Sequence, residues 1–343
     1  MDFKIDNRKI GKNHKPYIIA EMSANHGNDI EVAKKIIIEA KKAGADAIKI
    51  QTYSADSITL NCKESAFEAK GAWEGMFLYD LYKNASMPWE WTTELQKIAK
   101  EVGITLFSSP FDFSAVEFLE KLDMPAYKIA SPEIVDLPLV RRIAQTKKPI
   151  ILSTGNATIA QINDAVAVLL EENSEFAILK CTSEYPANPK DINLKSIPFL
   201  KELFKCPVGL SDHTLGTAIP IASIALGADI IEKHFILNKK YKTADSFFSA
   251  TPDELKAIVE GTQMVKFALG EVTFPIVAKR SQRSLIAIKD IAQNEPLLEN
   301  INFKSIRPGG GIESKDISIV QDRKATKAIK RGTLLSWKMI GGF

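Results

Sequence analysis

Two of the four histidines follow neighbouring apolar runs of the chain. His213 comes after the run Pro207–Leu210, and His234 comes after the run Asp229–Ile231. If both runs are consecutive parallel strands, the two imidazole rings end within reach of one metal ion. A single histidine is more often a core residue, but a pair at matched positions favours a divalent-metal site. Two nitrogen ligands leave room for water and substrate, which suits Mn²⁺ or Mg²⁺ better than structural zinc.

Two lysines, Lys49 and Lys128, also lie in or directly after apolar runs. Serines stand at the ends of other such runs: Ser109, Ser131, Ser153 and Ser211. Each serine alone is more easily explained as a loop or helix-cap residue. A buried ammonium group without a counter-charge is costly, however, and hydroxyls add hydrogen-bond donors. We therefore predict that these side chains bind a phosphate or carboxylate ligand.

Carboxylates accompany these residues at the same points of the pattern: Glu21, Glu133, Glu232 and Asp245. We expect at least one of them to act as a general base. Asp245 lies in a segment after the last apolar run that is long enough to reach over a pocket, although such a loop charge is ordinarily solvated. Asp212, beside His213, either supports a metal ligand or caps the helix that follows it, and we favour the helix cap.

The elements that must position these residues alternate between short apolar runs and longer amphipathic segments. The predicted strands are Tyr17–Ala20, Ala47–Ile50, Ile104–Phe107, Ala126–Ile129, Pro149–Leu152, Phe176–Leu179, Pro207–Leu210 and Asp229–Ile231. The helical patterns include Glu31–Ala43, Trp89–Val102, Ala115–Leu122, Ala160–Glu171, Thr217–Leu226 and Pro252–Leu269. Eight such units predict an α/β fold, a closed (β/α)₈ TIM barrel, whose strand ends meet at one mouth. An open Rossmann-like sheet is disfavoured because no G-x-G-x-x-G follows the first strand.

Two segments depart from this regular frame within the predicted barrel domain, residues 1–269. Residues 1–14 are expected to form a hairpin that closes the barrel floor. The long insertion Tyr53–Pro88 follows the second strand and is rich in aromatic residues. It either shapes the pocket or packs at the periphery, and the sequence favours neither reading.

A linker over residues 270–281 precedes a smaller domain over residues 282–343. Short apolar runs and turns at Asn294-Glu295 and Arg331-Gly332 predict a β-rich fold. A faint self-similarity at an offset of 38 pairs Ala287 with Ala325, Lys289 with Lys327, Ile291 with Ile329 and Leu297 with Leu335. A domain of this size is only marginally stable alone, so we expect it to dock on a barrel.

The composition is ordinary for a soluble globular protein. In 343 residues, 45 Lys and Arg against 42 Asp and Glu give a net charge of +3, which excludes a strongly basic nucleic-acid binder. Three cysteines are too few for a disulfide framework or a four-ligand zinc site. Since the sequence shows neither a secretory signal nor a membrane span, we expect a cytoplasmic protein that binds small molecules rather than nucleic acid or membrane.

Several motifs of the chain, taken together and in order, resemble the sialic acid (N-acetylneuraminate) synthase family. The motifs are Asn25–Gly27, Ile48–Thr52, Ser108–Phe111, Tyr127–Ser131, Leu152–Gly155, Cys181–Pro186, Gly209–Thr214 and Ile231–Phe235. Arg307–Ile312 is similar to part of the family's C-terminal antifreeze-like (SAF, β-clip) domain. Leu78–Lys83, Pro88–Trp91 and Ala244–Ser249 resemble the branch that makes pseudaminic acid.

The resemblance implies a carbon–carbon bond-forming transferase that uses phosphoenolpyruvate. The expected partner is the open-chain aldehyde of 2,4-diacetamido-2,4,6-trideoxy-altrose, and the products are pseudaminic acid and phosphate. It further implies Mn²⁺, Mg²⁺ or Co²⁺ on His213 and His234. The six lysines and serines named above would hold the phosphate and carboxylate.

The resemblance also suggests roles for further residues and an assembly. Glu133 would activate water, with Glu21 and Asp245 near the sugar. Gln51, Tyr185 and Arg307 are candidates for sugar contacts, and Arg307 would reach the site of the partner chain in a domain-swapped homodimer. We expect the neighbourhood of Ser183 and Phe247-Phe248 to offer apolar surface where the sugar lacks a 6-hydroxyl.

Other functions stay open at this point. A neuraminate or legionaminate synthase would use the same motifs on another N-acetylated amino sugar. A class I aldolase would use Lys49 or Lys128 to form a Schiff base. A non-catalytic polysaccharide-binding protein has little need for histidines, lysines and carboxylates that converge on one mouth.

Overall fold

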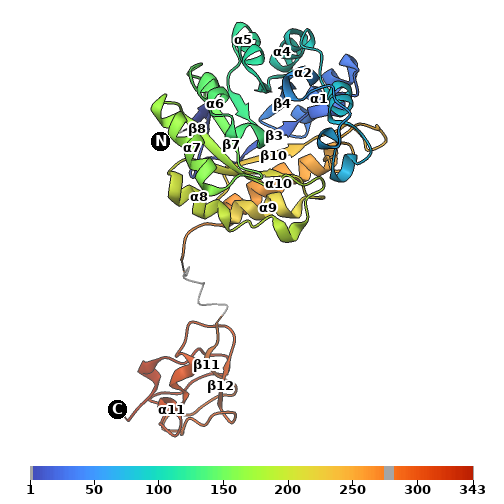
Figure 1. Cartoon of the computed structure of the whole chain (residues 1–343). Helices are drawn as coiled ribbons and strands as arrows, with labels where there is room; N and C mark the ends of the chain where they lie inside the picture. The colour runs from blue at the N-terminus through green and yellow to red at the C-terminus, as the bar shows by residue number, and fades with distance from the viewer. Residues whose placement is uncertain (1–2, 274–281, 343) are drawn as a thin grey trace. The chain divides into compact units, whose positions relative to one another are not determined.

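The structure, a computed structural model, describes residues 3–273 and 282–342 (Figure 1). Contacts between residues divide the chain into two compact units, Met1–Gly270 and Glu271–Phe343. Residues 274–281 of the expected linker lie outside the described residues. None of the helices in the described ranges combines the length and apolarity that a membrane crossing requires.

Eight parallel strands of the first unit form a closed barrel, as predicted (Figure 1). In chain order they are β3 (Tyr17–Glu21), β4 (Ala47–Thr52), β5 (Thr105–Pro110), β6 (Tyr127–Ile129), β7 (Ile150–Ser153), β8 (Phe176–Cys181), β9 (Val208–Asp212) and β10 (Ile230–His234). The barrel closes where β10 pairs with β3, with Ile230 beside Tyr17 and His234 beside Glu21. Several strands continue beyond the predicted apolar runs into the polar residues that follow them.

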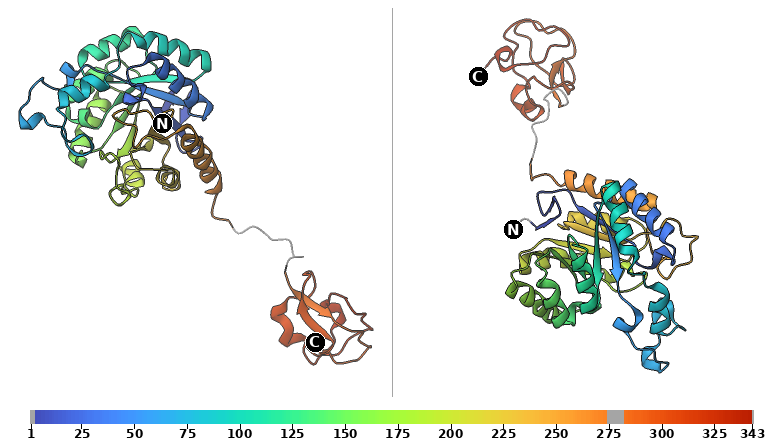
Figure 2. Two further views of the ribbon diagram at one scale, coloured as in Figure 1. Left: turned by 90° about the vertical axis from the view of Figure 1, so that its right-hand side faces the viewer. Right: turned by 90° about the horizontal axis from the view of Figure 1, so that it is seen from above.

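Helices cover the outside of the barrel (Figures 1 and 2). They are α1 (Ile30–Lys42), α4 (Trp91–Val102), α5 (Phe113–Lys121), α6 (Leu137–Ala144), α7 (Ile159–Glu171), α8 (Ser196–Phe204), α9 (Ala218–Ala225) and α10 (Pro252–Ala268). The start of α1 shows why they form: the Asp29 carboxylate accepts hydrogen bonds from the backbone N–H groups of Glu31 and Val32. Its apolar stripe, which includes Ile36 and Ile37, is buried against the strands.

Alternate residues of each strand face the inside of the barrel. Near the floor these residues are apolar and form one buried cluster with members such as Ile19, Phe107, Ile151 and Leu179. Two residues further along, the same face carries a charged or hydroxyl side chain on every strand but β8, where it carries Cys181. The inward-facing side chains are thus apolar near the floor of the barrel and polar in the next layer, at the carboxyl ends of the strands.

An N-terminal hairpin packs on the floor of the barrel. Strands β1 (Phe3–Ile5) and β2 (Arg8–Ile10) pair in antiparallel register, and Asp6 in the turn has φ 50°. Phe3, Ile5 and Ile10 are buried in the same cluster as the inward-facing residues of the barrel strands. The hairpin therefore closes the apolar end of the barrel and leaves the polar end open.

The insertion after β4 folds into short helices. These are α2 (Ala55–Ile58), the 3₁₀ turns Ser65–Phe67 and Gly71–Trp73, and α3 (Leu78–Ala85). In Figure 2 the insertion projects from the end of the barrel away from the N-terminal hairpin. The indole Nε1 of Trp73 donates to the carbonyl of Ala244 at 3.0 Å, which ties the insertion to the segment between β10 and α10.

The second unit has its own apolar core around the antiparallel strands β11 (Ser284–Ala287) and β12 (Phe303–Ile306). The short elements η7 (Ser314–Asp316), α11 (Ile317–Val320) and η8 (Trp337–Met339) follow. The expected β-rich character is present, although strand pairing outside β11 and β12 is limited to isolated bridges among the described residues.

The self-similarity at an offset of 38 corresponds to an internal two-fold arrangement of this unit. Ile291 and Ile329 exchange both backbone hydrogen bonds at 2.8 Å. Two further pairs of bonds are related by the same offset. The Leu297 N–H bonds to the Arg323 carbonyl as Leu335 N–H does to Leu285, and the Asn294 N–H bonds to the Ala325 carbonyl as Gly332 N–H does to Ala287. Asn294 and Gly332 also share a positive φ, 64° and 84°, so the weak sequence repeat reflects a real structural repeat.

Candidate active site

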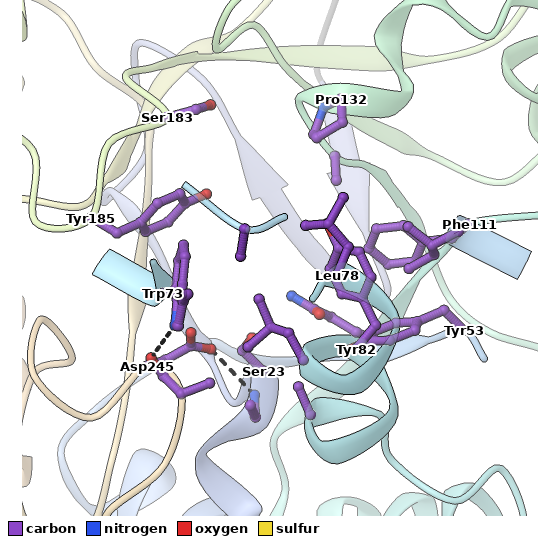
Figure 3. A pocket seen from close by; sticks show the side chains of 18 of the residues that line it. Ser23, Tyr53, Trp73, Leu78, Tyr82, Phe111, Pro132, Ser183, Tyr185 and Asp245 are labelled. Carbon is purple, nitrogen blue, oxygen red and sulfur yellow. Dashed lines mark hydrogen bonds between the residues drawn. The ribbon is translucent and has the colours of Figure 1, made fainter. Parts of the chain in front are cut away.

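A cavity of about 400 Å³ opens at the carboxyl ends of the barrel strands (Figure 3). Several predicted site residues line it: Gln51, Glu133, Tyr185, His234 and Asp245. The insertion supplies much of the remaining wall through Ile58, Trp73, Leu78 and Tyr82. Of the two readings of the insertion, the pocket-shaping one is therefore correct.

The two lysines lie deeper in the barrel, below the cavity, and both are almost completely buried. The Lys49 Nζ is 2.7 Å from Oε2 of Glu21 and 3.9 Å from Oε1 of Glu232, while the Lys128 Nζ is 3.6 Å from the same Glu232 oxygen. Glu232 also accepts a hydrogen bond of 3.1 Å from Ser211. The expectation that these lysines lack a counter-charge in the protein is wrong, because two buried carboxylates face them.

The same network gives the two lysines different proton affinities. Burial acts to lower the pKa of Lys49, but the charges of Glu21 and Glu232 outweigh it, and the pKa is raised. Burial dominates at Lys128, whose pKa is lowered although Glu232 opposes the shift. Burial also acts on Glu232 itself, yet Lys128 and Lys49 hold its pKa below the usual value. The charged form of Lys49 is thus stabilised by its two carboxylate neighbours, whereas the charged form of Lys128 is stabilised less.

The predicted anion-binding hydroxyls occupy the same polar region of the barrel. Ser109 accepts a hydrogen bond of 3.3 Å from the Lys49 Nζ, and Ser131 accepts one of 3.0 Å from the backbone N–H of Gly155. The Ser153 hydroxyl is buried and has no partner among the described residues. A buried hydroxyl without a partner is costly, so it marks a place where a ligand oxygen would fit.

His213 and His234 lie with their ring centroids 5.3 Å apart, inclined at 63°. The His213 Nδ1 is 2.8 Å from the Thr182 carbonyl, and the His234 Nδ1 is 3.6 Å from Oδ2 of Asp245. When Nδ1 faces an oxygen acceptor, Nε2 is the atom that remains for a metal. Within residues 3–273 and 282–342, no three His, Cys, Asp or Glu side chains converge to hold a metal. The pair therefore fits an open site completed by water and substrate.

Asp245 is held in place from two sides. Its Oδ2 accepts a hydrogen bond of 3.3 Å from the backbone N–H of Ala24, and the same oxygen faces His234. Burial acts to raise the pKa of Asp245, but the nearby His234 outweighs it, so the pKa is lowered. Asp245 is therefore a fixed, ionised neighbour of the histidine pair, not a solvated loop charge.

Glu133 differs from the other carboxylates because it forms no ion pair with any residue in the described part of the chain. It lies in the 3₁₀ turn Pro132–Val135 after β6, and its Oε2 is buried without a partner among the described residues. Burial raises the pKa of Glu133 to about 7. A carboxyl group with such a pKa can accept and return a proton near neutral pH, as a general base requires.

Gln51 and Glu21 are linked across neighbouring strands. The Gln51 Nε2 donates to Oε1 of Glu21 at 2.9 Å, so both oxygens of this carboxylate face a donor. Gln51 lines the cavity, whereas Glu21 is buried beneath it. Glu21 therefore orients Gln51 and neutralises Lys49.

Aromatic rings surround the histidines. The Tyr185 ring centroid is 4.4 Å from that of His213, and the Phe248 centroid is 4.8 Å from that of His234. Phe248 is buried behind the histidines, while Phe247 is partly exposed and contacts Trp73. Neither phenylalanine lines the cavity. Of the neighbourhood expected to receive the 6-deoxy end of the sugar, Ser183 lines the cavity, but the expectation is wrong for the two phenylalanines, which pack against other side chains.

Arg307 belongs to the second unit and is exposed there. It forms no ion pair with any carboxylate among the described residues. The carbonyl of the next residue, Pro308, accepts a hydrogen bond of 2.8 Å from the Ser284 hydroxyl, which anchors the loop to β11. The structure thus fixes the local setting of Arg307 within its own unit.

Sequence reasoning gave no site role to some residues that the structure places here. The Cys181 Sγ is 3.9 Å from the His213 Nδ1. Burial acts to raise the pKa of this thiol, but His213 outweighs it and the pKa is lowered to about 6. Asp212 was expected to cap a helix, and this is wrong: it accepts from the Lys233 Nζ at 2.6 Å and from Thr214. Both Asp212 and Lys233 lie on the outward face of their strands.

Comparisons with known proteins place the chain in a family. Residues 36–274 match the sequence profile of the NeuB family. The chain is 45% identical to the pseudaminic acid synthase of Helicobacter pylori over 329 residues, covering 94% of this chain and 96% of the relative. The chain belongs to the NeuB family.

Other members of the NeuB family show similar agreement. The identity is 46% to the pseudaminic acid synthase of Campylobacter jejuni serotype O:2, covering 94% of this chain and 95% of the relative. The crystal structure of N-acetylneuraminic acid synthetase from Leptospira borgpetersenii, in complex with citrate, superposes with a TM-score of 0.73 at 32% identity. That comparison covers 82% of this chain and 94% of the other. The predicted family resemblance is confirmed.

Proposed function

We propose that this NeuB-family chain is a pseudaminic acid synthase. It condenses phosphoenolpyruvate with the open-chain aldehyde of 2,4-diacetamido-2,4,6-trideoxy-altrose and water, giving pseudaminic acid and phosphate. The observation that carries the proposal is the histidine pair, with rings 5.3 Å apart, above a layer that contains two lysines and an unpartnered serine. Such a mouth can hold an aldehyde and an anion at the same time. The identity to two pseudaminic acid synthases supports the choice of sugar.

The polar layer supplies the binding site for phosphoenolpyruvate. Ser153 offers a free hydroxyl, and Ser131 is fixed by the Gly155 N–H. Lys128 is held by Glu232 at 3.6 Å, longer than a close ion pair, so an incoming phosphate can compete for this ammonium group. Lys49 stays with Glu21 at 2.7 Å and contributes through Ser109.

The histidine pair would hold a divalent cation through its Nε2 atoms. Mn²⁺, Mg²⁺ or Co²⁺ bound there would supply Lewis-acid polarisation of the aldehyde. The Thr182 carbonyl orients the His213 ring through a contact of 2.8 Å with its Nδ1, and Asp245 faces the Nδ1 of His234 at 3.6 Å, so both Nε2 atoms remain for the cation. Gln51 and Tyr185 line the same cavity and can contact the sugar's hydroxyl and acetamido groups.

The chemical steps use the residues of this chain as follows. C3 of phosphoenolpyruvate forms a bond to the aldehyde carbon, while the lysines and serines keep the phosphate and carboxylate in place. Water adds to C2 of the resulting oxocarbenium ion, and Glu133 takes the proton that the water loses, which balances the proton that the former aldehyde oxygen takes up to become a hydroxyl. The tetrahedral intermediate then expels inorganic phosphate and leaves the α-keto acid. A carboxylate with a pKa of about 7 is suited to this proton transfer.

The second unit completes the proposal. We assign the second unit to the antifreeze-like (SAF) type because Arg307–Ile312 resembles that domain and because the unit has a small β-rich core. The proposed assembly is a domain-swapped homodimer in which Arg307 enters the mouth of the partner's barrel. An exposed arginine that forms no ion pair with the described residues is available to an acetamido oxygen.

The test is phosphate release by the purified full-length chain with phosphoenolpyruvate and a panel of sugars. The panel contains the trideoxy-altrose, the corresponding legionaminate precursor and N-acetylmannosamine. We expect the altrose sugar to give the highest kcat/KM, with activity lost in EDTA and restored by Mn²⁺. Equal or higher kcat/KM with either other sugar would overturn the substrate assignment. Covalent trapping of pyruvate on Lys128 by borohydride would indicate an aldolase instead.

A further inference from the structure

The cavity has two walls of different chemistry (Figure 3). One carries Tyr185, Trp73 and Asp245, near the histidine pair. The opposite wall carries Leu78 from the insertion and Phe111 from the segment after β5. The labelled side chains of the two walls face each other across an open space. A substrate that spans the space therefore meets polar groups at one end and apolar groups at the other.

The apolar wall is built by the insertion and braced from behind. Ile58 at the end of α2 and Leu78 at the start of α3 have no polar side-chain atoms, and both line the cavity. The Tyr53 ring packs edge-on against Phe111 at 5.1 Å and against Tyr82 at 6.1 Å between centroids. Tyr53 is buried, so this aromatic cluster fixes the position of Phe111. We call Ile58, Leu78 and Phe111 the apolar wall.

We propose that the apolar wall, with Leu78 at its centre, is the specificity determinant that receives the C6 methyl group of the sugar. This inference rests on the proposed function, which places the aldehyde carbon at the histidine end of the cavity. The far end of the open-chain sugar then points across the cavity toward Leu78. The methyl group of a 6-deoxy sugar is desolvated there at no cost, whereas a 6-hydroxyl would face Ile58, Leu78 and Phe111 without a hydrogen-bond partner from these three side chains.

The apolar wall replaces the surface that was expected from Phe247 and Phe248. Tyr53 and Tyr82 line the same cavity and carry hydroxyl groups. They can donate to the carbonyl oxygen of the acetamido group that the diacetamido sugar carries on C4, two carbons from the methyl group. The apolar wall thus offers surface for the methyl group, and Tyr53 and Tyr82 offer hydroxyl donors for the amide.

The experiment compares two sugars that differ only at C6: the 6-deoxy diacetamido altrose and its 6-hydroxylated counterpart. The variant is Leu78→Asn, which keeps a similar shape and adds a hydrogen-bonding group. The matched control is Leu60→Asn, because Leu60 lies in the same insertion but is 63% exposed and does not line the cavity. We expect Leu78→Asn to change the ratio of kcat/KM for the two sugars at least tenfold toward the hydroxylated one, while Leu60→Asn leaves it unchanged.

A second variant keeps the proposal testable if Leu78→Asn unfolds. Leu78→Ala removes apolar contact without adding a polar group, so it should raise KM for the 6-deoxy sugar with little change in kcat. An unchanged ratio in Leu78→Asn, or an unchanged KM in a folded Leu78→Ala, would overturn the inference. If the wild-type chain releases no phosphate with any sugar, the proposed function itself fails, and the two failures are thereby distinguished.

Discussion

The Nζ atom of Lys49 lies 2.7 Å from Oε2 of Glu21, and the two residues are register partners on β4 and β3. Both side chains are almost fully buried. Such a pair contributes little net stability compared with an apolar pair, but removal of one partner leaves an uncompensated buried charge. The ion pair therefore links the fold to the site.

Lys49→Met should destabilise the barrel by about 3–5 kcal/mol, because Glu21 is left without its cation. The double variant Lys49→Met with Glu21→Gln should recover most of this loss and stay inactive, since Lys49 also serves the anion site. Urea unfolding followed by circular dichroism measures the first effect, and phosphate release measures the second. A single variant as stable as the wild type would show that the pair is not important for the fold.

Glu133 should make kcat/KM fall on the acidic side of pH 7, which gives the pH profile an acidic limb. Burial raises its pKa to about 7, so the carboxylate form that accepts a proton is lost as the pH falls below that value. kcat/KM should therefore decrease toward pH 6. Glu133→Gln should lower kcat by about 10²–10⁴-fold and abolish this limb in the residual activity. Glu117→Gln, on the exposed face of α5, is the control and should keep the wild-type profile.

His26 should make the stability of the barrel depend on pH. Burial lowers its pKa to about 4 from 6.5, and its Nδ1 accepts a hydrogen bond of 3.0 Å from the Asn28 N–H. Between pH 6.5 and 4 the unfolded chain binds a proton that the folded chain does not. The free energy of unfolding should thus be complete above pH 6.5 and fall by about 1.4 kcal/mol per pH unit below it.

The variant His26→Asn keeps an acceptor near Asn28 but cannot be protonated. Its free energy of unfolding, measured in urea, should fall less between pH 6.5 and pH 5 than that of the wild type, by about 2 kcal/mol. Parallel pH dependence in the two proteins would show that His26 is not the group responsible.

Complementation tests the proposed swap of the second unit. Arg307→Ala and His213→Ala chains should each be inactive, because each lacks one part of every site. Mixed chains that exchange subunits would form heterodimers with one intact site of two, so a sizeable fraction of activity should return. Mass spectrometry of the mixture establishes that exchange occurred. Exchange without recovery would mean that Arg307 serves its own barrel or none.

The barrel could be predicted from sequence because its strands are short apolar runs at regular spacing. The roles of the individual polar residues were harder to predict, because at the carboxyl end of a strand both the inward and the outward face carry polar side chains. Lys49 and Glu232 face the inside of the barrel and lie close together. Lys233, the next residue after Glu232 on β10, faces outward and pairs with Asp212 on β9. Alternation along each strand could have separated the two sets.

Other features depend on contacts between distant segments. That Phe248 packs behind His234, or that Glu232 neutralises both lysines, follows from side-chain positions that no local pattern contains. The insertion is similar: its aromatic residues suggested a pocket, but the apolar wall depends on how Tyr53 packs between Tyr82 and Phe111. The sequence shows which residue types the insertion contains, but the position of the apolar wall depends on tertiary packing.

The repeat at an offset of 38 has a consequence for how the second unit is built. Its two halves donate backbone hydrogen bonds to each other, with Ile291 and Ile329 bonded reciprocally at the centre. Two identical subunits joined by a two-fold axis make the same kind of reciprocal contact. The unit therefore has the geometry of a small homodimer fused into one chain. Residues 300–322, which include β12 and carry Arg307, lie between the two halves in the sequence, so the symmetric scaffold carries Arg307 on a segment that the repeat does not duplicate.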